Sequence, residues 1–217
     1  MKDIFDKFSI FDFIAILLSG ICISTISLIV IYFVYGLKFS ISLGIDKNIL
    51  FFIISYLLGI IFQEVGAFLY NKVFFRNDKL LKRTFSLNNK NSLLSNEEKS
   101  SLYKYFQDKL NITGERAIYN YCKDYVYKNG NKLDHDRGLS LSAMSRSLSV
   151  CFMLLFFTLL GLQLFGTFNA NIVYLIAFMI LLPILSVVFF VRYLFFMNTR
   201  YTNILRLFYY DNIVPKV

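Results

Sequence analysis

Residues 147–191 read SLSVCFMLLFFTLLGLQLFGTFNANIVYLIAFMILLPILSVVFFV, a run of 45 residues that contains no Asp, Glu, Lys or Arg. A helix needs about 20 apolar residues to cross a bilayer, so a run of this length predicts two membrane spans joined by a very short turn. A second uncharged run of 25 residues covers residues 13–37. These two runs indicate an integral membrane protein.

The composition agrees with this interpretation. Hydrophobic residues make up 57% of the 217 residues, charged residues only 17%, and the mean hydropathy is +0.56. A soluble domain carries about 25% charged residues. The pattern predicts an all-α membrane protein whose four spans form two hairpins. We expect an N-terminal hairpin in residues 1–75 (spans about 13–37 and 48–70), a helical insert in 76–146, a C-terminal hairpin in 147–191 (spans about 147–168 and 172–191) and an amphipathic tail in 192–217.

The basic residues predict the orientation. The first twelve residues, the insert with its flanking Lys72, and the tail together hold 21 Lys and Arg, whereas the two remaining loops hold 2. Because cytoplasmic loops carry the excess of Lys and Arg, both termini and the insert are expected in the cytoplasm, with the chain in the cell membrane. The net charge of +9 is therefore interpreted mainly as a topology signal, and nucleic acid is not expected as a partner.

Small residues mark a packing face in the first two spans. Gly20 and Ser24 form a small-xxx-small pair, which allows helices to approach closely in a bilayer. The expected helix-packing residues are Ser19, Gly20, Ser24, Gly59 and Gly66. The sequence leaves open whether they serve packing within one chain or contact between copies of a homo-oligomer.

Three polar residues stand out within the spans: Gln63, Glu64 and Gln163. An ionisable group costs about 2.5–3.5 kcal/mol at the centre of a span, so Glu64 indicates either a functional group or a paired one. It lies about five residues inside the expected end of its span, roughly 8 Å along the helix. A structural salt bridge to Lys72, Arg146 or Arg192 is favoured over an ion or proton site.

Basic side chains gather where the spans leave the bilayer. Each is worth about 1 kcal/mol near an anionic leaflet, so anionic lipids of the inner leaflet are expected partners. The interfacial basic residues are Lys72, Arg76, Lys79, Arg83, Arg146 and Arg192.

The insert carries its own helix signals. Ser95 followed by Glu98 predicts a capping box. A second helix is expected after Thr113 and a third from near Asp136 directly into the third span. The expected buried residues of the second helix are Ile118, Tyr121, Cys122 and Tyr125. Two short helices form a poor core alone, so the tail is expected to cover their aromatic faces.

No catalytic, cofactor or metal site is predicted. Asp134, His135 and Asp136 form the only acidic cluster around a histidine, and N-capping of the third helix is favoured over catalysis because the chain has a single His. The three cysteines, Cys22, Cys122 and Cys151, suggest no disulfide framework.

Three functions remain open. The first is a non-enzymatic, oligomeric pore or membrane-perturbing module controlled by the cytoplasmic helices. In its layout of four spans, inward termini and a helical cytoplasmic part, the chain resembles the small four-span proteins that accompany bacterial defence and CRISPR accessory systems, which implies a role in antiviral defence. The second is a membrane anchor that recruits a cytoplasmic partner protein. The third is a lipid-acting enzyme that uses Glu64 with the interfacial arginines.

Overall fold

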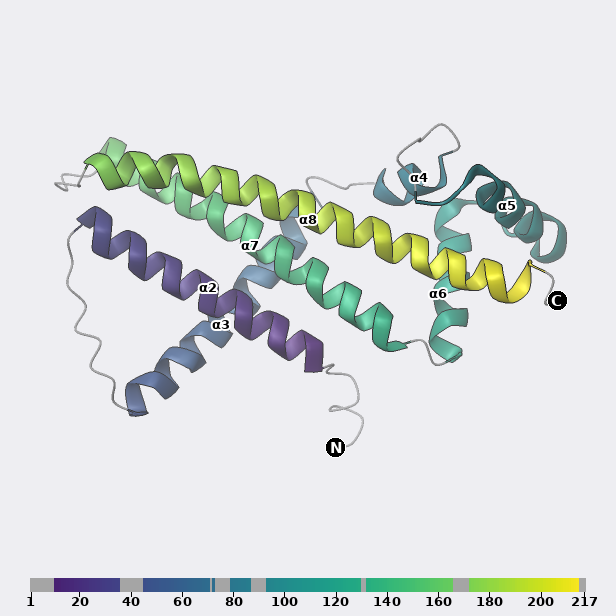
Figure 1. Ribbon diagram of the computed structural model, residues 1–217, viewed down its shortest axis with the longest axis horizontal. Coiled ribbons are helices and arrows are strands. Elements are labelled where there is room, and N and C mark those ends of the chain that lie inside the picture. Colours follow the sequence, from purple (N-terminus) through teal and green to yellow (C-terminus); the bar gives the residue numbers. More distant parts are fainter. Residues whose placement is uncertain are drawn as a thin grey trace. The chain divides into compact units, whose positions relative to one another are not determined.

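The computed structural model describes residues 10–35, 45–70, 72, 79–86, 93–129, 132–165 and 172–214. Within these ranges every regular element is a helix and none is a strand. Figure 1 shows them in chain order. The helices are α2 (Ile10–Tyr35), α3 (Ile45–Leu69), α4 (Lys79–Phe85), α5 (Asn96–Leu110), α6 (Glu115–Lys128), α7 (Lys132–Phe165) and α8 (Ile172–Asn212).

Four of these helices, α2, α3, α7 and α8, are long and apolar enough to cross a membrane. Their apolar segments are Ile10–Tyr32, Asn48–Leu69, Arg137–Leu164 and Ile172–Asn212. An all-helical chain with four such segments fits a multi-pass membrane protein.

Helix α7 begins at Lys132, four residues before the position expected from the sequence. Asp134 and Asp136 therefore lie inside the first turns of the helix and not at its N-cap, so the capping interpretation is wrong. As expected, the helix then continues without interruption into the third apolar run.

The chain divides into two compact units. Unit 1 comprises Met1–Tyr70 and Ser140–Tyr193, and unit 2 comprises Asn71–Leu139 and Leu194–Val217. The core of unit 1 is apolar and draws on α2, α7 and α8. Its buried members are Ile23, Val30, Val34, Leu148, Cys151, Phe152, Leu159, Leu175 and Leu182.

Unit 2 starts from the predicted capping box. The Ser95 hydroxyl accepts a hydrogen bond from the Glu98 backbone N–H at 3.1 Å, and the Glu98 carboxylate accepts one from the Ser95 N–H at 2.6 Å. The last turns of α8 pack against α5 and α6, as the sequence predicted for the tail. The buried core consists of Leu81, Phe85, Leu94, Leu102, Phe106, Ile118, Tyr119, Cys122, Val126, Ile204, Leu205 and Phe208.

The sequence analysis is wrong about the burial of one aromatic residue of α6. Tyr121 was expected to be buried, yet it is 42% exposed, whereas its neighbour Tyr119 is 8% exposed. The buried face of α6 runs through Tyr119, Cys122 and Val126 at spacings of three and four residues. The buried face of α6 is therefore rotated by part of a helical turn relative to the face expected from the sequence.

Candidate functional site

A row of buried serines on α7 is the most polar feature inside unit 1. Its members are Ser140, Ser142, Ser145, Ser147 and Ser149, each at most 4% exposed. The sequence interpretation missed this row, although the stretch GLSLSAMSRSLS at residues 138–149 carries its signal. Burying five hydroxyls on one helix is favourable only where they find hydrogen-bond partners.

The first partners lie at the start of the row. Ser140 Oγ donates to Asp12 Oδ1 of α2 at 2.5 Å, and Ser147 Oγ donates back to the Ala143 carbonyl at 2.9 Å. The Ser140–Asp12 contact links two apolar helices through a charged acceptor.

The end of the row contacts two further segments, Tyr70 and α8. The Tyr70 hydroxyl donates to Ser149 Oγ at 2.9 Å, and Ser149 Oγ donates to the Ser186 carbonyl of α8 at 2.9 Å. Ser186 Oγ returns a hydrogen bond to the Ser149 carbonyl at the same distance. The Tyr70 ring also packs edge-on against Tyr193, with ring centroids 4.8 Å apart.

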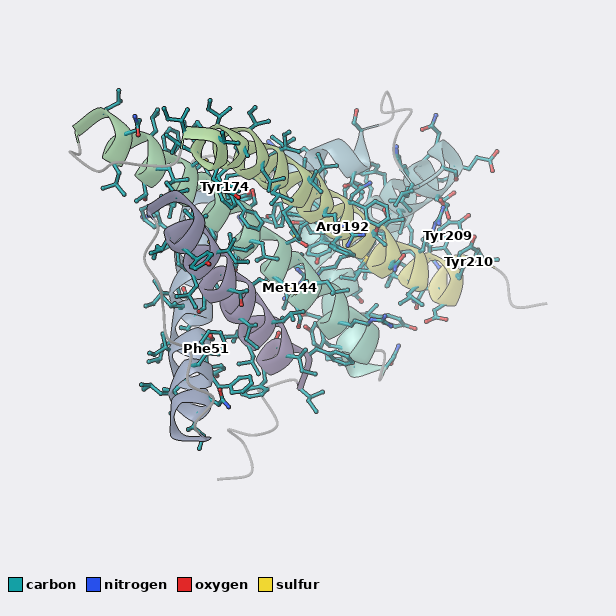
Figure 2. All side chains as sticks on the ribbon, turned by 60° about the vertical axis from the view of Figure 1, so that its left-hand side comes forward. Phe51, Met144, Tyr174, Arg192, Tyr209 and Tyr210 are labelled. Carbon is teal, nitrogen blue, oxygen red and sulfur yellow. The ribbon has the colours of Figure 1, made fainter. Side chains whose placement is uncertain are left out.

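Arg146 lies in the middle of this row. Its Nη2 donates to the Gln63 carbonyl of α3 at 3.4 Å, it hydrogen-bonds to Tyr193, and it interacts electrostatically with Glu64. In the described part of the chain, the buried atoms Arg146 Nε and Ser145 Oγ have no hydrogen-bond partner. Figure 2 marks α7 by Met144, two residues before this arginine.

Arg146 interacts electrostatically with the Glu64 carboxylate. It is one of the three basic residues that the sequence predicted as partners of Glu64. Lys72 and Arg192 are exposed, and Figure 2 labels Arg192 on α8. Gln163 is exposed near the end of α7. Arg76 lies outside the described residues, as do the side chains of Lys79 and Arg83.

The small residues of α2 and α3 lie against each other within one chain. A Cβ atom on Gly20 would stand 1.7 Å from the Ser55 carbonyl oxygen, and one on Gly59 would stand 2.2 Å from the Ile16 carbonyl oxygen. Ser55 Oγ donates to Ser24 Oγ at 3.0 Å between the same helices. Such a close backbone approach leaves no room for a side chain.

Two further small residues have neighbours elsewhere. Ser19 Oγ donates to the Ile16 carbonyl of its own helix at 2.9 Å. Gly66 faces Arg146, whose Cγ would be 3.3 Å from an added Cβ. Gly66 therefore makes space for the arginine on α7.

Unit 2 holds several buried titratable groups. Lys99 is fully buried and its Nζ donates to the Ser86 carbonyl at 2.7 Å, and burial lowers its pKa. Burial also raises the pKa of the Cys122 thiol. Burial, together with the charge of Glu115 and a hydrogen bond to it, raises the pKa of Tyr103 to about 12. Lys99 thus connects α5 to Ser86, the residue after α4, and Tyr103 connects α5 to Glu115 of α6.

The chemistry available to these residues is hydrogen bonding and charge pairing. Among the described residues, no group of three or more His, Cys, Asp or Glu could hold a metal ion. Comparison with known proteins gives no match to a family profile, a curated protein or a solved structure.

Proposed function

We propose that this chain is a multi-pass membrane anchor that holds its basic helical unit 2 at the cytoplasmic face of the cell membrane, where unit 2 recruits a partner protein. The observation that carries the proposal is the continuity of α8. This single helix of 41 residues starts in the most apolar segment of the chain and ends with Ile204, Leu205 and Phe208 in the core of unit 2. The helix is therefore shared by the two units, with residues up to Tyr193 in unit 1 and residues from Leu194 in unit 2.

The charge of unit 2 supports the choice of partner. It contains 17 Lys and Arg against 9 Asp and Glu, which is most of the excess of positive charge in the chain. Such a surface attracts anionic lipids and steers acidic proteins toward it. The exposed aromatic Tyr121 on α6 adds an apolar contact of the kind that anchors protein interfaces.

The orientation is tested with single cysteines in a background in which Cys22, Cys122 and Cys151 are replaced by alanine. A cysteine at Ser42 is expected to react with a membrane-impermeant maleimide in intact cells, and one at Asn88 only after the cells are opened. Reaction of the cysteine at Asn88 in intact cells would overturn the proposed anchor.

Recruitment is tested by cross-linking in living cells, followed by purification of the chain. A discrete cross-linked species is expected with the unaltered chain and with the conservative variant Lys123→Arg, but not when Lys104, Lys109 and Lys123 are all replaced by glutamate. Persistence of the species in the triple variant, with equal membrane insertion, contradicts recruitment by the basic unit.

An oligomeric pore is the second candidate, and the exposed Glu64 on α3 favours it. Since an apolar core fills unit 1, a polar path would run between copies. The pore predicts that expression depolarises the membrane, as a potential-sensitive dye reports, and that Glu64→Ala prevents this. The resemblance to defence proteins further predicts that cells expressing the chain resist phage infection. If the membrane potential is unchanged before and during infection, the pore is excluded and the anchor is the proposal that stands.

A further inference from the structure

We draw no further inference here: the strongest candidate, the cleft of about 380 Å³ in unit 2 where Glu97 and Glu98 at the start of α5 face Arg206 near the end of α8, carries nothing, because it rests on acidic residues at a helix N-terminus, Glu98 and Arg206 are already paired with each other, and no second observation among the described residues points to a ligand.

Discussion

The carboxylate of Glu98 on α5 accepts a hydrogen bond from Arg206 Nε on α8 at 3.1 Å. The same carboxylate closes the capping box through the Ser95 N–H. The Glu98 side chain is 8% exposed and that of Arg206 is 42% exposed. One acidic side chain thus stabilises the start of α5 and fastens the end of α8 to it.

Replacing Glu98 should therefore destabilise unit 2, so that it opens more often. Glu98→Ala removes the cap and the charged hydrogen bond together, and we expect a loss of about 2 kcal/mol, against about 1 kcal/mol for Ser95→Ala. Arg206→Ala should cost no more than about 1 kcal/mol, because the arginine is substantially solvated.

The readout is maleimide labelling of Cys122, with Cys22 and Cys151 replaced by alanine. Cys122 is fully buried, so its labelling rate reports how often unit 2 opens. The exposed Glu97 offers the matched control Glu97→Ala. A labelling rate in Glu98→Ala equal to that of the control contradicts the proposed fastening.

The second prediction concerns Lys99, whose ammonium group is buried with the Ser86 carbonyl as its acceptor. Burial holds its folded-state pKa below the ordinary value of 10.5. Between the folded-state pKa and pH 10.5 the unfolded chain binds more protons, so stability rises with pH across this window. Lys99→Met keeps the aliphatic packing and removes the buried charge, and is expected to be more stable than the unaltered chain at pH 7.

Thermal unfolding in detergent at pH 7 and pH 10 checks this. The advantage of Lys99→Met should shrink at the higher pH, while the exposed Lys104→Met should show neither effect. A loss of stability at pH 7 would mean that the hydrogen bond to Ser86 outweighs the cost of burying the charge.

The third prediction follows from Tyr103. Its pKa in the folded chain is about 12, compared with 10 for an ordinary tyrosine, because of burial and the neighbouring Glu115. Above pH 10 the unfolded chain releases this proton first, so the stability that the neutral phenol provides is lost as the pH rises from 10 to 12. Tyr103→Phe should flatten the decline of thermal stability over this range, and the exposed Tyr210→Phe should leave it unchanged. Parallel curves for Tyr103→Phe and the unaltered chain would contradict the assignment.

Features that depend on one continuous stretch of sequence were predictable. The apolar segments of the sequence predicted four helices of membrane-spanning length, and Ser95 with Glu98 predicted the capping box. The apolar stripe beyond Arg192 likewise predicted that the tail completes the core of the insert.

Features that depend on which neighbour a helix meets were not predictable. Tyr119 and Tyr121 are both aromatic and differ by about 200° around α6, so only the position of the facing helix decides which one is buried. The serines of α7 show the same limit. The hydroxyls of Ser140 and Ser149 find partners only because Asp12, Tyr70 and Ser186 come from three other segments.

The close approach of α2 and α3 gives the last prediction. A methyl group on Gly20 would overlap the Ser55 carbonyl oxygen, which belongs to rigid helix backbone, so Gly20→Ala must push the helices apart and break the Ser55–Ser24 hydrogen bond. We expect a loss of about 2 kcal/mol or more, within the range for overpacking a core. Gly161→Ala on α7 is the matched control, because among the described residues a methyl group there meets no atom within 4 Å beyond the backbone of its own helix and its chain neighbours. Alanine also favours a helix over glycine by about 1 kcal/mol, so this control should be neutral or stabilising. Thermal unfolding in detergent measures both variants, and equal melting temperatures would show that α2 and α3 do not meet through Gly20.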